Sequence, residues 1–176
     1  MSAGTGTASV DAVRIVDVLV APDPVAALRR VTGWYVAAWG DRYPADQLAP
    51  TLDELARPGP PVVLVALDGD DAVVGTVAID PDDVPDRGDL APWLASLYVD
   101  AAWRRRGLGA RLVDAVCARA AADGLTHLHL MTYDEDGLDG WYRRLGWAVV
   151  DRGVHAGRSM LLFTRSVQAT KPPDHA

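Results

Sequence analysis

Arg104-Arg105-Arg106-Gly107-Leu108-Gly109-Ala110 is the stretch of this sequence that decides the fold. It follows the run Trp93–Val99 (WLASLYV), whose apolar and aromatic residues predict a strand. It opens the segment Gly107–Ala122, in which apolar residues recur every four positions, as on one face of a helix. The next apolar run, Leu125–Thr132, predicts a second strand. Because strand–helix–strand crossovers join parallel strands, we expect these two strands to lie parallel in one sheet.

The basic turn has the chemistry of an anion-binding site. The first N–H groups of a helix lack intrahelical partners and carry partial positive charge. Gly107 and Gly109 have no side chains, so the backbone can approach a phosphate closely. The turn lacks the second half of a dinucleotide fingerprint and the Lys-Ser/Thr of a P-loop. A solvated basic helix start is the alternative, and we predict a phosphate site.

The remaining segments predict an α/β fold. Strands are expected at 13–20, 62–67, 72–79, 93–99, 125–132, 147–150 and 160–164, and helices at 24–40, 48–55, 107–122 and 138–145. Two of these strands flank the acidic turn Asp68–Asp71, which is a hairpin signal. This order predicts one mixed sheet with helices on both faces. We expect a single domain over residues 13–166, with flexible tails at 1–12 and 167–176.

Length and composition exclude several classes of protein. The chain has 176 residues, enough for one domain with its own core. Hydrophobic residues make up 49% and charged residues 23%, which argues against wholesale disorder. Lys plus Arg total 17 and Asp plus Glu 24, so the net charge is −7. An acidic protein binds nucleic acids poorly, because both carry negative charge, and it attracts cationic partners.

The N-terminal residues and the cysteine content predict a cytoplasmic protein. Cys117 is the single cysteine, so an intrachain disulfide or a cysteine-based zinc site is excluded, and we expect no metal. The first residues do not resemble a signal peptide. No apolar run approaches the roughly 20 residues of a membrane span, so we expect no membrane contact.

Two motifs together resemble the GCN5-related N-acetyltransferases, the GNAT family. Arg104-x-x-Gly107-x-Gly109 is similar to the family's Arg/Gln-x-x-Gly-x-Gly/Ala signature. The stretch Trp141–Trp147 (WYRRLGW) is similar to its aromatic-Tyr-x-x-x-Gly-aromatic segment. The resemblance is specific over Trp93–Val150 and only topological over Val13–Ile79. It implies the GNAT fold: a mixed, mostly antiparallel sheet with a V-shaped splay between two central parallel strands.

The resemblance implies an N-acetyltransferase that uses acetyl-CoA. The expected cofactor-binding residues are Leu97, Tyr98, Val99, Arg104, Arg105, Arg106, Gly107, Leu108, Gly109, Ala110 and Tyr142. Of these, the turn would take the diphosphate and the strand the pantetheine arm. The amide of Leu97 would polarise the thioester carbonyl, where charge develops during attack. Tyr142 would protonate the leaving thiolate.

The residue that takes the proton of the acceptor amine is not assigned by the sequence. Some family members carry a glutamate where this chain has Trp93, and Ala95 follows it. A free alkylamine with a pKa of about 10.4 is mostly protonated at neutral pH, so a base or a relaying water is needed. The candidate bases are His129, His127, Asp86, Asp89 and Glu54.

The expected acceptor is a primary amine of a small cationic molecule, acetylated by direct attack in a ternary complex. The loop Asp80–Leu90 carries five aspartates that attract cations. Expected acceptor contacts are Trp39, Tyr43, Asp86, Asp89 and Trp93, since aromatic rings hold ammonium groups.

The resemblance also extends to members that modify aminosugar antibiotics, so an aminoglycoside-type acceptor and a role in antibiotic resistance are expected. The alternatives are a protein or peptide acetyltransferase acting on N-termini or lysines, and a non-catalytic acyl-CoA-binding sensor. A homodimer is a tendency of the family.

Overall fold

The computed structural model describes residues 9–40 and 48–168. Its strands are β1 (Arg14–Asp17), β2 (Val62–Leu67), β3 (Val73–Asp80), β4 (Trp93–Val99), β5 (His127–Tyr133), β6 (Ala148–His155) and β7 (Arg158–Ser166). Its helices are α1 (Pro24–Trp39), α2 (Leu48–Leu55), α3 (Leu108–Ala122) and α4 (Asp139–Arg144). Short 3-10 helices are η1 (Val10–Ala12), η2 (Val18–Val20), η4 (Pro85–Leu90), η5 (Ala101–Trp103) and η6 (Asp134–Asp136).

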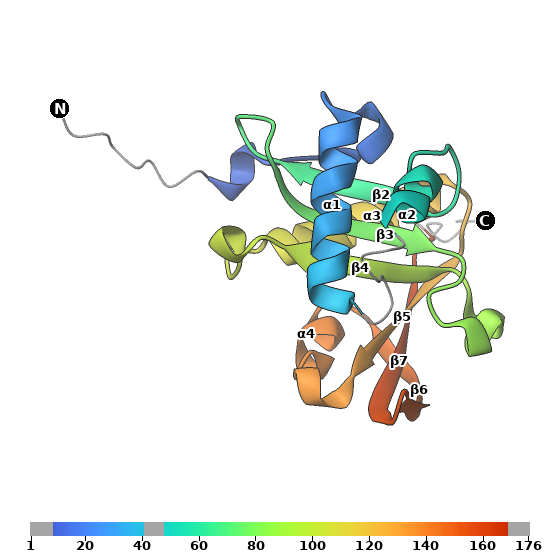
Figure 1. Ribbon diagram of the computed structural model, residues 1–176. Coiled ribbons are helices and arrows are strands. Elements are labelled where there is room, and N and C mark those ends of the chain that lie inside the picture. Colours follow the sequence, from blue (N-terminus) through green and yellow to red (C-terminus); the bar gives the residue numbers. More distant parts are fainter. Residues whose placement is uncertain (1–8, 41–47, 169–176) are drawn as a thin grey trace, which may run out of the picture. The chain divides into compact units, whose positions relative to one another are not determined.

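The strands form one mixed sheet, as predicted (Figure 1). The strand order is β1-β2-β3-β4-β5-β7-β6. β4 and β5 are parallel, with Trp93 opposite His129. The pairs β1–β2, β5–β7 and β6–β7 are antiparallel. The predicted α/β class and the parallel central pair are therefore confirmed.

The chain divides into two compact units. The first consists of Met1–Ala78 and Ser96–Val113, and the second of Ile79–Ala95 and Asp114–Ala176. The sequence prediction of a single domain over residues 13–166 stays a prediction.

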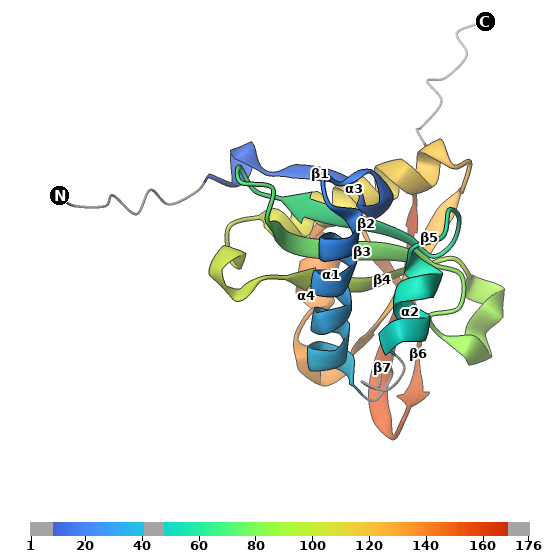
Figure 2. The ribbon, with the colours of Figure 1, turned by 45° about the horizontal axis from the view of Figure 1, so that its top comes forward.

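In the first unit, α1 covers one face of β2 and β3 (Figures 1 and 2). The side chain of Asp23 caps the helix by accepting from the N–H of Ala26 at 2.9 Å, and Pro24 takes the first helical position, as the sequence predicts. The apolar side of α1 packs in one cluster with alternate side chains of β2. The buried members include Leu28, Val31, Tyr35, Val63, Val65 and Leu67. Strand alternation turns the intervening residues of β2 to the opposite face.

The opposite face of β3 packs against the start of α3. A Cβ atom built on Gly75 would lie 3.0 Å from Cδ1 of Leu112 and 3.1 Å from the carbonyl oxygen of Tyr98. Glycine at this position therefore allows the first turns of α3 to approach the sheet closely. Further along α3, Cys117 is buried, and burial raises the pKa of its thiol to about 11.

In the second unit, β5 carries a strictly alternating pattern. Leu128, Leu130 and Thr132 are buried, and the residues between them are partly or fully exposed. On the face of β5 that carries the partly exposed residues, Met131 belongs to a second apolar cluster. In this cluster Trp93 packs with Val84 and Leu162, and Leu90, Met131 and Met160 surround them.

Several expected strands have different limits in the structure, and for two of them the local contacts give the reason. Val18–Val20 was expected to extend the first strand but forms a 3-10 turn, because the carboxylate of Asp17 accepts from the N–H of Leu19 at 3.0 Å. The strand expected at 147–150 continues to His155, because a tight turn at Ala156 and Gly157, both with positive φ, pairs it with β7.

We expect Gly75→Val to lower the free energy of unfolding by about 1–3 kcal/mol, because the added carbons collide with α3 and the backbone of β4. Gly69→Val is the matched control, since a Cβ atom there meets nothing within 4 Å. Chemical denaturation followed by circular dichroism measures both. Equal stabilities of the two variants would contradict the close approach at Gly75.

Candidate functional site

The basic turn lies in the first unit, between η5 and α3. The first intrahelical bond runs from the N–H of Arg111 to the carbonyl of Gly107 at 3.2 Å, so the three N–H groups between them precede the hydrogen-bonded helix. Arg105 and Gly107 have φ values of 59° and 84°. A Cβ atom on Gly107 would meet no atom within 4 Å, so the turn is open at this position. The turn thus has free N–H groups, basic side chains and open space, which together suit a diphosphate.

Asp100 fixes the start of this turn. Its N–H donates to the carbonyl of Val74 at 2.9 Å, and its carboxylate accepts from the N–H of Ala102 at 3.0 Å. The same carboxylate pairs with the guanidinium of Arg30 on α1 at 2.8 Å. The backbone N–H of Asp100 therefore ties the segment after β4 to β3, and its side chain ties that segment to the following 3-10 turn and to α1.

Arg104 and three other side chains form a stack in the first unit. The Nε of Arg104 donates to the carbonyl of Val99 at 2.9 Å, and its guanidinium carbon lies 5.3 Å from the ring centre of Tyr98. Tyr98 stacks on Trp34, with ring centres 4.9 Å apart. The guanidinium carbon of Arg30 lies 4.8 Å from the ring centre of Trp34. The order is therefore Arg30, Trp34, Tyr98, Arg104, and the predicted cofactor residue Arg104 points its Nε at the end of β4.

Trp39, a predicted acceptor contact, lies beside the same strand. Its ring centre is 6.3 Å from that of Tyr98, edge to face, and 5.8 Å from that of Tyr35. The side chain of Trp39 is partly exposed. The first unit thus places an accessible indole next to the strand segment expected to hold the pantetheine arm. Tyr43 lies outside the described residues.

Tyr142 lies on α4 in the second unit. Its side chain is buried among aromatic rings, with centres 4.8 Å from Trp141, 5.7 Å from Phe163 and 6.2 Å from Trp147. Burial raises the pKa of its hydroxyl well above the usual value. The phenol therefore keeps its proton at neutral pH, as a proton donor must.

Sequence reasoning missed the arginine that organises the acidic loop. Arg87 pairs with Asp89 at 3.1 Å and with Asp151 on β6 at 2.7 Å. The hydrogen bond from Arg87 holds the pKa of Asp89 below its usual range. Asp86 is exposed. The only signal in the sequence was a lone arginine among five aspartates, which says nothing about its partner on a distant strand.

Two further predicted residues meet in the second unit. Trp93 is fully buried, and its ring centre is 6.0 Å from that of His129. His129 is partly exposed. By contrast, His127 is exposed, and its Nδ1 lies 3.0 Å from the hydroxyl of Thr126. Glu54 is an exposed residue of α2 in the first unit.

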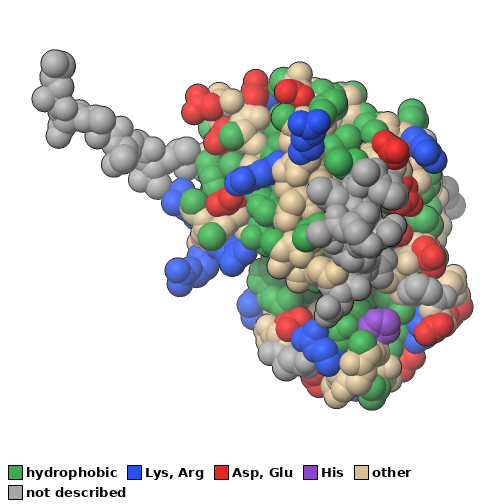
Figure 3. Space-filling model, viewed as in Figure 1, with side chains coloured by type: hydrophobic (Ala, Val, Ile, Leu, Met, Phe, Trp, Pro, Cys, Tyr) green, Lys and Arg blue, Asp and Glu red, His purple; other side chains and the backbone are tan. Residues whose placement is uncertain are grey.

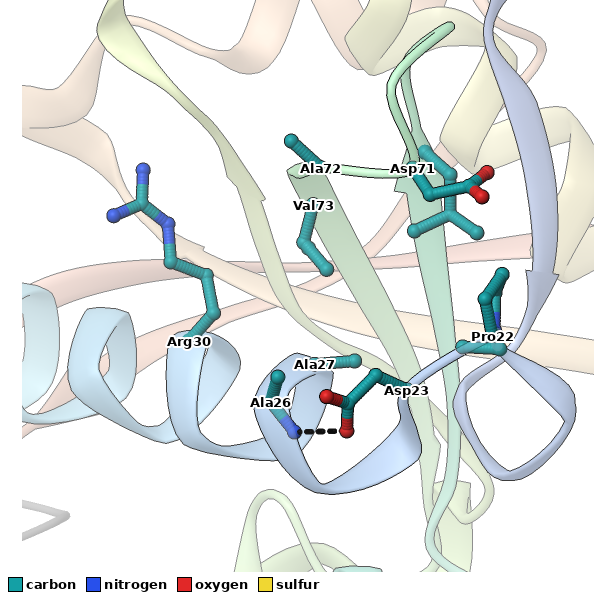
Figure 4. A pocket seen from close by; sticks show the side chains of 10 residues that line it. Pro22, Asp23, Ala26, Ala27, Arg30, Asp71, Ala72 and Val73 are labelled. Carbon is teal, nitrogen blue, oxygen red and sulfur yellow. Dashed lines mark hydrogen bonds between the residues drawn. The ribbon is translucent and has the colours of Figure 1, made fainter.

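A cavity of about 280 Å³ lies at the start of α1 (Figure 4). Arg30, Asp23 and Asp71 contribute its charged side chains. All three have partners within the protein: Arg30 with Asp100, Asp23 with the N–H of Ala26, and Asp71 with Arg14. The cavity does not include any residue of the basic turn.

One face of the molecule carries charges of both signs. On the face shown in Figure 3, acidic and basic side chains are interspersed among apolar ones. Within residues 9–40 and 48–168, no three or more His, Cys, Asp or Glu side chains are grouped to hold a metal ion. Over the same residues, no helix combines the length and the apolar character needed to span a membrane.

Solved structures of low sequence identity share this fold. An aminoglycoside 6'-N-acetyltransferase complexed with coenzyme A has a TM-score of 0.71 at 19% identity, covering 90% of this chain and 99% of its own. The protein yncA of Salmonella typhimurium, solved with its cofactor acetyl-CoA, has a TM-score of 0.65 at 19% identity, covering 93% of this chain and 98% of its own. Mutant forms of the spermidine/spermine N-acetyltransferase of Vibrio cholerae have a TM-score of 0.66 at 11% identity, covering 88% and 95%. No curated protein matches the sequence.

The sequence itself carries the family assignment. The model of the Acetyltransferase (GNAT) family matches residues 28–147, which is more than half of the chain and includes both the basic turn and Tyr142. The strand order with its parallel central pair agrees with the fold of the solved structures. The chain therefore belongs to the GNAT family of acetyltransferases and is an N-acetyltransferase.

Proposed function

We propose that the protein transfers the acetyl group of acetyl-CoA to a primary amine of a small polycationic molecule, with an aminoglycoside-type aminosugar as the leading acceptor. The observation that carries the acetyl-CoA part of this proposal is the turn at residues 104–110, which combines free helix N–H groups, an open Gly107 and adjacent arginines. A turn of this kind fits a co-substrate that contains a diphosphate, as acetyl-CoA does.

The residues of the first unit fit the cofactor. The N–H groups of Leu108, Gly109 and Ala110 would bind the diphosphate, with Arg105 and Arg106 adding charge. The backbone of Leu97, Tyr98 and Val99 would hold the pantetheine arm. When bound, acetyl-CoA supplies an acetyl group activated as a thioester.

Two groups of the chain act on the thioester in this proposal. The N–H of Leu97 donates to the carbonyl oxygen, where negative charge develops during attack. The role of Tyr142 follows from the family resemblance: its hydroxyl donates a proton to the departing sulfur. Burial raises the pKa of this phenol, so the group is protonated at neutral pH and has a proton to donate.

The acceptor class rests on charge and aromatic surface. Asp86 and Asp89 are exposed on a loop with an excess of acidic residues, so a polycation is attracted to this part of the second unit. Trp39 offers a partly exposed ring in the first unit. Solved structures with the same fold include enzymes for aminoglycosides and for spermidine, both polycationic amines.

Incubation of the protein with acetyl-CoA and separate panels of aminosugars, polyamines and peptides, read by mass spectrometry, tests this proposal. We expect a mass increase of one acetyl group on the aminosugars first. Acetylation of peptides alone would replace the small-amine acceptor by a protein substrate. Binding of acetyl-CoA without transfer to any amine would indicate an acyl-CoA sensor.

We expect Gly107→Trp to weaken coenzyme A binding at least about tenfold, because the indole occupies the open space over the turn. Gly124→Trp is the matched control. It lies just after the other end of α3, has a φ of 82°, close to the 84° of Gly107, and is equally open. Both variants therefore carry the same backbone strain, and only one changes the turn. Isothermal titration measures the affinities; similar values for the two variants would refute the phosphate site.

We expect Tyr142→Phe to lower kcat about tenfold or more while leaving the affinity for acetyl-CoA nearly unchanged, because only the proton donor is lost. Tyr133→Phe is the control, since Tyr133 is a partly exposed ring beneath the guanidinium of Arg158. Because burial raises the pKa of Tyr142, its deprotonation should add no alkaline limb to the wild-type pH profile below about pH 10. Unchanged turnover in Tyr142→Phe would remove its role as the acid.

A further inference from the structure

We propose that His129 is the base that accepts the proton of the acceptor amine. This inference rests on the proposed function, because it concerns the same reaction. It identifies one residue among the five candidates that the sequence left open.

The position of His129 on β5 places its ring on a sheltered face. His129 lies opposite Trp93 in the parallel pair, and the ring centres are 6.0 Å apart at an interplanar angle of 61°. Leu90 and Met131 are part of the apolar cluster formed around Trp93 on this face. The imidazole is thus held by a rigid strand and an aromatic neighbour rather than by a loop.

The two ring nitrogens of His129 differ in their surroundings. Nδ1 is enclosed by protein and accepts or donates no hydrogen bond within the described part of the chain. The carbonyls of Leu90 and Pro92 lie near the imidazole and favour a proton on it. We therefore assign the resident N–H to Nδ1, which leaves Nε2 as the ring nitrogen with a free lone pair to take a proton; the His129 side chain as a whole is partly exposed.

The charges around His129 set its protonation. Burial lowers the pKa of the imidazole below its usual value, and the neighbouring His127 on β5 acts in the same direction. Asp89, from the preceding loop, and the carbonyls of Leu90 and Pro92 act in the opposite direction. The neutral imidazole therefore prevails at neutral pH and is ready to accept, and Asp89 stabilises the imidazolium once it forms.

The other candidates are poorer bases. His127 is exposed at the beginning of β5 and its Nδ1 already contacts Thr126. Asp89 has a lowered pKa because Arg87 donates to its carboxylate, so it holds a proton weakly. Glu54 is exposed on α2, and Asp86 on its loop, and neither has a structural feature that shelters it.

The step balances without a further reactant. The amine nitrogen forms a bond to the thioester carbonyl carbon, and the carbon–sulfur bond breaks, with its electron pair leaving on sulfur. The amine attacks in its neutral form, after its ammonium proton has passed to solvent, and the N–H proton that becomes acidic as the C–N bond forms passes to Nε2 of His129. The imidazolium then returns that proton to solvent. This removal is favourable at the stage of C–N bond formation, when the attacking nitrogen is far more acidic than a free ammonium.

His129→Gln and His127→Gln form a matched pair for the test. They are two positions apart on one strand, and strand alternation puts both side chains on the same face. With the aminosugar or polyamine that the wild type acetylates, we expect His129→Gln to lower kcat about a hundredfold and His127→Gln to leave it within about twofold. The affinity for acetyl-CoA, measured by titration, should not change in either variant. Equal kcat values in the two variants would overturn the proposal.

The pH profile gives a second measurement that needs no variant. Because the neutral imidazole is the active form, kcat should fall as the pH drops through the pKa of His129, which lies below the usual histidine value. NMR titration of the wild-type histidine signals measures that pKa directly. A kinetic pKa that differs from it would refute the assignment even if His129→Gln does not fold.

The outcomes separate this inference from the proposed function. If the wild type acetylates no amine, the proposed function fails. If the wild type acetylates an amine and His129→Gln does so equally well, only the assignment of the base fails.

Discussion

The N–H groups at the start of α3, which no carbonyl of the helix accepts, are the feature on which the proposed chemistry depends. They are useful only if the turn before them is fixed, and Asp100 fixes it through Val74, Ala102 and Arg30. The helix must also lie against the sheet, which requires glycine at position 75. An anion site made of backbone groups thus depends on packing several residues away from it.

The stack of Arg30, Trp34, Tyr98 and Arg104 explains how α1 and the basic turn are held together within the first unit. Each ring of the central pair has a guanidinium over it, and each contact of this type is worth about 0.5–1 kcal/mol at a partly exposed site. Arg104 therefore has two roles in the family motif. Its backbone belongs to the phosphate turn, while its side chain braces the end of β4.

Local patterns in the sequence were enough for most of the fold. Asp23 and Pro24 mark the start of α1, and the turn at Asp68–Asp71 lies between two strands as expected. Where side chains act on their own backbone in less regular ways, the prediction was wrong, as at Val18–Val20. The basic turn and Tyr142 were singled out in the sequence because short motifs carry them, and their roles stay predictions.

The remaining site features depend on contacts between distant parts of the chain. The partner of Arg87 is Asp151, far away in the sequence, so no local pattern reveals it. Likewise, His127 and His129 look equivalent in a strand, and only their neighbours in the fold separate an exposed ring from a sheltered one. Burial and register therefore decide questions that residue type alone left open.

The buried Cys117 gives this protein an internal probe of its own opening. It is the single thiol of the chain and sits on the helix that begins at the basic turn. Because burial raises the pKa of the thiol to about 11, an alkylating reagent reacts with it only when the helix leaves its packed position. The rate of alkylation thus reports how often α3 detaches, and slower labelling with coenzyme A present would be the signature of a ligand that clamps the helix in place.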